Sequence, residues 1–252
     1  MSFPWIRTTT TAALLIVTVA GCGNGGSTAA DQPSTQPPSA TSTPTPTPAP
    51  DLSKLSAAAL FAKAKAAVTA ADGFRVRGTV TDGEKMTFDV QAAETIGLGK
   101  FTVNGEEITV LTSGKTTYLA LGEKSIRQRG KEAKDSAAEI DATVKVLKGK
   151  WIKRTKKDEE FDYLADMTRR ATYLGLFAPS GALTKKPQQT IDGVPAIGLN
   201  DGEGTLWVDS RTALPLQMQT AGDTLRFSDF GRIKTPKAPA ADDVLDGKAM
   251  GL

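Results

Sequence analysis

The residue with the clearest chemistry in this 252-residue chain is Cys22, its single cysteine. A cysteine thiolate is a nucleophile that can accept a lipid as a stable thioether. Cys22 follows the small residues Ala20 and Gly21, which end an apolar run over residues 12–20 that an arginine precedes. A basic start, a short apolar stretch and small residues predict a secretory signal peptide over residues 1–21. The apolar run is too short for a membrane-spanning helix.

The tetrapeptide Val-Ala-Gly-Cys at residues 19–22 resembles the lipobox of bacterial lipoproteins. The resemblance implies cleavage between Gly21 and Cys22 and a diacylglyceryl group on the Cys22 sulfur. Acyl chains would then hold the protein at the extracytoplasmic face of the cell membrane, each buried CH₂ contributing about 0.8 kcal/mol. The alternative is an ordinary signal peptide followed by an incidental cysteine.

Composition excludes several kinds of chemistry. The chain has no histidine, so Ser-His-Asp triads, Cys-His dyads and histidine zinc sites are ruled out. No motif typical of a nucleophile elbow or a phosphate-binding loop is present. We therefore expect no catalytic residue, no metal site and no cofactor. The formal net charge of +3 gives no support to nucleic-acid binding.

The exported part divides into a tether and one domain. Residues 22–51 are rich in Gly, Ser, Thr and Pro and end in repeated Thr-Pro pairs. Such a segment cannot bury a core and is predicted to be a disordered, partly extended tether. Residues 52–252 have the length and composition of one folded domain.

Helical and alternating patterns in the domain predict an α+β fold. Apolar residues at helical spacing predict helices over residues 52–71, 131–148 and 161–177. Alternation and turn chemistry predict strands over 74–80, 86–90, 95–103, 108–111, 116–121, 149–153, 190–199, 204–208, 216–220 and 225–230. Because Asp-Gly, Asn-Gly and Ser-Gly pairs lie in three of the four connections between the first five strands, we expect an antiparallel meander.

Five short motifs follow the tether in a characteristic order. They are Thr117-Tyr118-Leu119, Gly149-Lys150-Trp151, Thr205-Leu206-Trp207-Val208-Asp209, Leu214-Pro215-Leu216 and Phe227-Ser228-Asp229-Phe230-Gly231. Together with the lipobox and the tether, they resemble actinobacterial lipoproteins of the LppX/LprG type, which have a LolA-like lipid-binding domain. The resemblance implies a single, strongly curved antiparallel sheet, an unclosed half-barrel, whose concave face is covered by helices. It also implies an acylated lipid or lipoglycan held between the sheet and the helices.

Apolar residues on one face of the strands are the candidate lipid-binding residues. They are Val76, Met86, Phe88, Val90, Ile108, Val110, Tyr118, Leu206, Val208, Leu216, Met218 and Phe227. For each residue the alternative is a packed core side chain, since one face of every strand is expected to be apolar. Alanines and glycines around the helices, Gly97 and Gly99 among them, favour an incompletely filled interior, the alternative being that alanine-rich helices simply pack close.

Two functions follow from these expectations. The first is a monomeric, non-enzymatic lipoprotein that binds and transfers or presents an acylated lipid in the cell envelope. The alternative is a protein-interaction or envelope-sensing module with a filled core and no lipid cavity. Basic residues around Trp151 suggest contact with anionic headgroups, the alternative being a solvated face; they are Lys145, Lys148, Lys150, Lys153, Arg154, Lys156 and Lys157.

Overall fold

The computed structural model describes residues 51–82, 84–156 and 159–250. The predicted signal peptide, Cys22 and the tether lie outside the described residues. The helices are η1 (Leu52–Lys54), α1 (Ala57–Ala70), α2 (Glu123–Glu132), α3 (Ala137–Leu147), α4 (Glu159–Met167), α5 (Arg170–Leu174), η2 (Ala241–Asp243) and η3 (Gly247–Met250). The strands are β1 (Gly73–Asp82), β2 (Glu84–Ala93), β3 (Ile96–Val103), β4 (Glu106–Ser113), β5 (Thr116–Leu121), β6 (Trp151–Lys153), β7 (Thr184–Ile191), β8 (Val194–Asn200), β9 (Thr205–Asp209), β10 (Pro215–Gln219), β11 (Thr224–Ser228) and β12 (Val244–Asp246).

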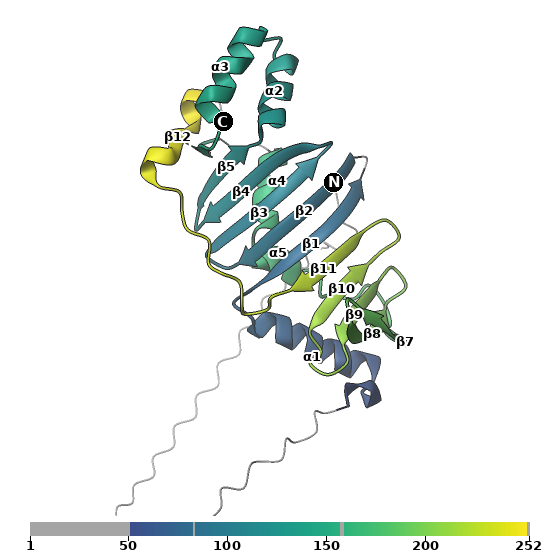
Figure 1. The fold of residues 1–252 in the computed structure, drawn as a ribbon. Helices are drawn as coiled ribbons and strands as arrows, with labels where there is room; N and C mark the ends of the chain where they lie inside the picture. Colours follow the sequence, from purple (N-terminus) through teal and green to yellow (C-terminus); the bar gives the residue numbers. More distant parts are fainter. Residues whose placement is uncertain (1–50, 83, 157–158, 251–252) are drawn as a thin grey trace, which may run out of the picture. The chain divides into compact units, whose positions relative to one another are not determined.

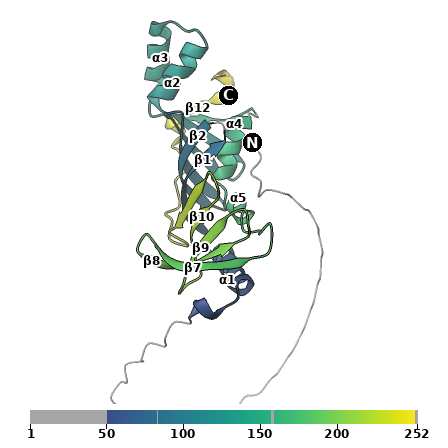
Figure 2. The same ribbon diagram turned by 90° about the vertical axis from the view of Figure 1, so that its right-hand side faces the viewer.

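The strands form one unclosed sheet in the order β12-β6-β5-β4-β3-β2-β1-β11-β10-β9-β8-β7. This arrangement confirms the predicted α+β class with a single open sheet. Every neighbouring pair is antiparallel except β12 and β6, which run parallel. Figure 2 shows that β7 and β8 run in a different direction from β1 and β2, so the sheet is strongly twisted.

Tight turns set the register of the hairpins. Asn104 and Gly105 between β3 and β4 have φ angles of 50° and 80°, as a two-residue hairpin turn requires. Asp192 and Gly193 have φ angles of 49° and 82° and form the same kind of turn. This second turn divides the region predicted as one strand over 190–199 into β7 and β8, which pair with each other.

Helices α1, α4 and α5 cover one face of the sheet, as expected for the concave face (Figures 1 and 2). Helix α1 begins after the N-cap Ser56, whose side chain accepts a hydrogen bond from the amide of Ala59. Its buried residues are Leu60, Ala64 and Val68, which lie four positions apart and therefore face the sheet together.

Helices α2 and α3 do not cover the concave face. The helix predicted over 131–148 corresponds to α3, which starts later, after a capping box formed by Ser136 and Glu139. Helix α2 was not predicted, and it forms a helical hairpin with α3. The hairpin lies beyond the end of the sheet near β5 (Figure 1). Its apolar side chains Ile126, Ile140, Val144 and Leu147 form a small core together with Ile152 of β6.

Candidate functional site

The structure brings most of the predicted lipid-facing residues together on the inner face of the sheet. Ten of the twelve lie in the main apolar core and are at most 8% exposed: Val76, Met86, Phe88, Val90, Ile108, Val110, Leu206, Val208, Met218 and Phe227. They come from β1, β2, β4, β9, β10 and β11, which the hairpin registers align side by side.

Tyr118 and Leu216 are not in this cluster, and their predicted inward orientation is wrong. Leu119, the neighbour of Tyr118, is the β5 residue that enters the core, so Tyr118 points to the outer face. Leu216 lies at a register shift between β10 and β9 and packs with Trp207 in an outer cluster. A register shift reverses the alternation of side chains, and the sequence pattern does not reveal it.

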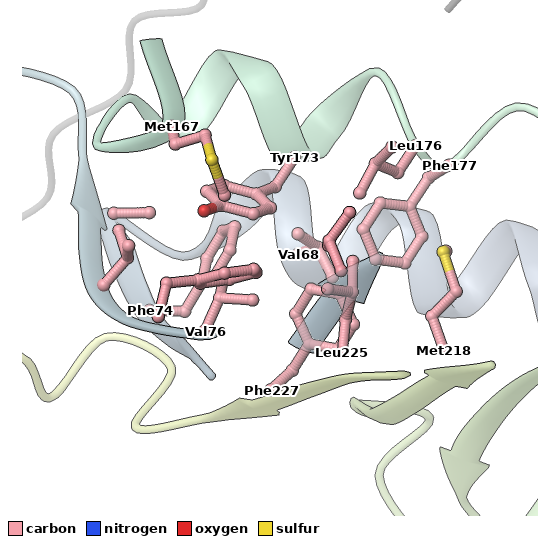
Figure 3. Close-up of a cluster of buried hydrophobic side chains, with 14 of the residues drawn as sticks. Val68, Phe74, Val76, Met167, Tyr173, Leu176, Phe177, Met218, Leu225 and Phe227 are labelled. Carbon is pink, nitrogen blue, oxygen red and sulfur yellow. The ribbon is translucent and has the colours of Figure 1, made fainter. Parts of the chain in front are cut away.

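Side chains fill the space between the sheet and the covering helices. Phe74, Phe101, Phe161 and Phe177 are each at most 2% exposed and lie in the same core. Figure 3 shows the side chains of α1 and α5 meeting those of β1, β10 and β11. The ring of Phe74 contacts Tyr173 of α5 edge-on, with 6.0 Å between the ring centroids. The inner face is therefore a packed core.

A small pocket lies at one end of this core. It is lined by Phe61, Leu176, Pro179, Leu183, Leu199, Asp201, Thr205, Leu206 and Met218. Its cavity volume is about 10 Å³, roughly the space that one water molecule occupies. Pockets that hold drug-sized ligands have volumes of roughly 300–1,000 Å³. An acyl chain would enter only after α1 or the segment before β7 moved away.

One polar residue of the pocket, Asp201, has a structural role. Its carboxylate accepts hydrogen bonds from the amides of Ser180 at 3.0 Å, Glu203 at 3.1 Å and Gly204 at 3.0 Å. These bonds close the β8–β9 turn and attach to it the segment that leaves α5. Because the carboxylate already has three donors, its main effect is to fix the rim of the pocket.

Two basic side chains hold the ends of α1. Lys185 of β7 donates to the carbonyl oxygens of Ser53 and Leu55 at 2.5 and 2.9 Å. Arg170 of α5 donates to the carbonyl oxygens of Thr69 and Ala71 at 3.0 and 2.5 Å. These carbonyl groups lie just before and at the end of the helix, so the two residues hold α1 at both ends over the pocket.

Among the described residues, three buried side-chain polar atoms have no hydrogen-bond partner: Nε of Arg129, Nε1 of Trp207 and, in the main core, the hydroxyl of Tyr173. The hydroxyl of Tyr173, a residue that is 2% exposed, makes no hydrogen bond within the described residues. Burial raises the pKa of Tyr173 far above its ordinary value, which keeps the phenol neutral. The hydroxyl lies among apolar side chains of the covering helix and the sheet (Figure 3).

Three of the seven basic residues around Trp151 form ion pairs, and a fourth, Lys157, lies outside the described residues. Lys148 lies 3.5 Å from Glu123, and Lys150 lies 2.8 Å from Asp243. Arg154, with a side chain only 6% exposed, pairs with Asp162 at 2.7 Å and stacks over the Phe161 ring. This region is a mixed-charge surface.

Sequence reasoning missed a charged row on the outer face of the sheet. Arg75 makes a two-pronged contact to Asp89 at 2.6 and 2.5 Å, and Arg77 reaches the same carboxylate at 3.2 Å. The hydrogen bond from Arg75 holds the pKa of Asp89 below its ordinary value. Arg226 pairs with Asp192. The alternation of Arg75 and Arg77 with inward apolar residues could have predicted that both arginines lie on this outer face.

The described residues contain neither a candidate metal cluster nor a membrane-spanning helix. Within those residues, no cluster of three acidic or cysteine side chains could hold a metal ion. None of the helices in the described part of the chain combines the length and the hydropathy that crossing a membrane needs.

Comparison with known proteins finds solved structures of low similarity. No protein-family model and no curated protein matches the chain. The structure of LprF from Mycobacterium bovis is 14% identical, with 73% of this chain and 97% of that chain aligned and a TM-score of 0.45. The Mycobacterium tuberculosis lipoprotein LppX is 14% identical, with 71% and 99% aligned and a TM-score of 0.40. The MucA/MucB complex of Pseudomonas aeruginosa gives 16% identity, with 74% and 59% aligned and a TM-score of 0.33. These values do not assign the chain to a family.

Proposed function

We propose that the protein is a lipoprotein anchored by Cys22 at the extracytoplasmic face of the cell membrane. Residues 1–21 are the signal peptide, residues 22–51 the tether and residues 52–252 a binding domain without catalytic activity. The order of basic start, apolar run and small residues before Cys22 supports the anchor. Labelling cells with radioactive palmitate tests the anchor. The chain should carry the label and be found in the membrane fraction, and Cys22→Ser should lose both the label and the membrane localisation. Label that persists in Cys22→Ser would disprove the anchor.

The domain acts by binding a protein partner at its surface. The observation that carries this proposal is the filled interior, in which four phenylalanines at most 2% exposed occupy the space under the helices. Cores packed in this way have no room for a ligand without rearrangement. A surface-binding module needs no such room.

Both edges of the sheet are protected, which directs a partner to a face. The edge strand β7 carries Lys186 and Pro187 near its start, and charge and proline both oppose the pairing of a further strand. The other edge strand, β12, has only three residues. A partner strand would find little continuous backbone at either edge.

Photo-crosslinking of the anchored full chain in cells tests the proposal. A photoreactive amino acid is placed at exposed positions on three elements, Lys100, Val146 and Gln188, and at Phe61 in the pocket. We expect a discrete protein adduct from at least one exposed position and no lipid adduct from Phe61. A lipid adduct at Phe61, with no protein adduct elsewhere, would overturn the proposal.

Acyl-chain binding is the second candidate, and the apolar lining of the pocket favours it. Leu176, Leu199, Leu206 and Met218 all contribute carbon surface there. Displacing α1 would expose Leu60 and Val68, at a cost of about 1.5–3 kcal/mol each. Burying a long acyl chain gains about 0.8 kcal/mol per CH₂, which is enough to offset that opening.

Native mass spectrometry separates the two candidates. The Cys22→Ser chain starting at residue 22 is incubated with phosphatidylglycerol. The surface-binding function predicts no one-to-one lipid adduct. The acyl-binding function predicts an adduct that increases in Lys185→Met and Arg170→Met, which release the two ends of α1, and not in the control Lys63→Met, an exposed α1 lysine.

A further inference from the structure

The strand register places like charges side by side on the outer face of the sheet. Arg77 of β1 is directly opposite Arg226 of β11, and on the other side it is opposite Asp89 of β2. Asp89 in turn is opposite Lys100 of β3. A single row across four strands therefore carries three cations and one carboxylate, and Arg75 lies in the adjacent row. We call these residues, Arg75, Arg77, Lys100 and Arg226, the basic row.

A row of this kind is unfavourable for folding alone. Like charges directly opposite in an antiparallel pair destabilise it, and Arg77 faces Arg226 in this way. Three carboxylates reduce the repulsion: Asp89 between Arg75 and Arg77, Asp192 beside Arg226, and Asp229, which attracts Arg75 electrostatically. The four cations of the basic row still outnumber these three carboxylates. Departures from local stability rules of this kind concentrate at functional sites.

The arginines are accessible and oriented. The side chains of Arg77 and Arg226 are 54% and 48% exposed. Arg77 contacts Asp89 through Nε, and Arg226 contacts Asp192 through one terminal nitrogen. Each guanidinium group is therefore oriented by a single nitrogen. Figures 1 and 2 show α1, α4 and α5 on the opposite face of the sheet, which leaves β1, β2 and β11 uncovered by these helices.

The chain itself shows what chemistry the row recognises. Asp89 accepts a forked, two-bond contact from Arg75, the geometry in which guanidinium groups bind carboxylates best. Asp192 reaches Arg226 from the turn after β7. In both cases a protein carboxylate is the bound group. An acidic segment of a second protein would bring carboxylates of the same kind to the other guanidinium nitrogens of Arg77 and Arg226.

We propose that the basic row on the outer face of β11, β1, β2 and β3 is the docking surface for an acidic segment of a partner protein. This inference rests on the proposed surface-binding function and specifies where the partner binds and what charge it carries. An anionic bilayer is the competing occupant. Insertion into a bilayer needs exposed apolar side chains near the basic row. Among the described residues, the large apolar side chain that is exposed is Val146, which lies on α3 and not beside the basic row.

Binding of a labelled deca-glutamate peptide to the Cys22→Ser chain starting at residue 22 tests the inference by fluorescence anisotropy. We expect affinity that weakens with salt. The double variant Arg77→Gln/Arg226→Gln should lose about fivefold to tenfold in affinity, the size expected when two exposed ion pairs are lost. The matched control Lys63→Gln/Lys65→Gln removes the same charge from exposed residues of α1 and should change affinity less than about twofold.

Three results would overturn the inference. Equal losses in the two double variants would mean that net charge alone attracts the peptide. Binding to phosphatidylglycerol vesicles, lost in Arg77→Gln/Arg226→Gln, with no binding to the peptide would assign the row to the bilayer. A protein crosslink from Val146 or Gln188 alone would leave the proposed function standing while rejecting this surface.

Discussion

The carbonyl oxygen of Thr168, just after α4, lies where a side chain at Gly97 of β3 would be. A Cβ atom built on Gly97 overlaps that oxygen, and the neighbouring Gly99 is close to the Thr168 methyl group. The amide of Ala93 also donates to the same carbonyl at 3.4 Å. The two glycines thus allow the end of α4 to touch the sheet backbone. They mark close packing, contrary to the expectation that they accompany an incompletely filled interior.

Replacing Gly97 should therefore destabilise the fold. Gly97→Ala forces backbone of α4 away from β3, because the overlapping atom is a carbonyl and not a flexible side-chain end. We expect a loss of about 1–3 kcal/mol in the free energy of unfolding, measured by denaturant titration. Gly222→Ala is the control, since nothing lies within 4 Å of its Cβ position. It should be neutral, and similar losses in both variants would contradict the packing argument.

A buried hydroxyl pair links β4 to the same junction. Thr168 donates to the carbonyl of Ala165 at 2.8 Å, so Thr112 is the donor in the 2.7 Å bond between the two hydroxyls. Thr168→Val should lower the free energy of unfolding by about 1–3 kcal/mol because it leaves the Thr112 hydroxyl buried without an acceptor. Adding Thr112→Val should recover part of that loss. A double-mutant cycle that shows simple additivity would rule out the coupling.

The unpartnered hydroxyl of Tyr173 predicts an unusual substitution. Tyr173→Phe removes a buried polar atom that has no hydrogen bond within the described residues and keeps the ring that packs against Phe74. The free energy of unfolding should stay unchanged or rise by up to about 1 kcal/mol. Tyr173→Ala, which also removes the ring, should lower it by about 3–5 kcal/mol. A clear loss of stability in Tyr173→Phe would show that the hydroxyl has a partner.

The Arg75–Asp89 contact predicts a specific acid dependence of stability. Because the pKa of Asp89 is lowered on folding, mainly by the hydrogen bond from Arg75, the ionised carboxylate stabilises the folded state. That contribution is complete above the ordinary aspartate pKa of about 3.9 and is lost as pH falls through the lower folded-state value. In Asp89→Asn, stability at neutral pH should drop and its decline below pH of about 4 should become shallower. Unfolding curves measured between neutral and acidic pH check this. Arg75→Gln should flatten the same region, and an unchanged acid slope in both variants would refute the assignment.

The sequence alone determined the local elements of this domain. Turn pairs such as Asn104-Gly105 and alternation along β1 to β5 depend on neighbouring residues, so the meander was predicted in its correct order. The inward residues of regular strands, Val76 and Phe88 among them, also follow from alternation. Two irregularities were not predicted, the register shift beside Leu216 and the turn at Asp192-Gly193. Both interrupt a strand where the sequence pattern looks continuous.

The tertiary structure decided whether the inner face is a cavity or a core. Apolar side chains on one face of a strand look the same in either case, because alternation fixes the face and not the distance to the covering helix. That distance depends on the contact of Thr168 with Gly97, between residues far apart in the chain. The basic row likewise exists only because strand pairing brings Arg226 beside Arg77. Contacts between distant residues are set by the packing of whole elements, and no local pattern encodes them.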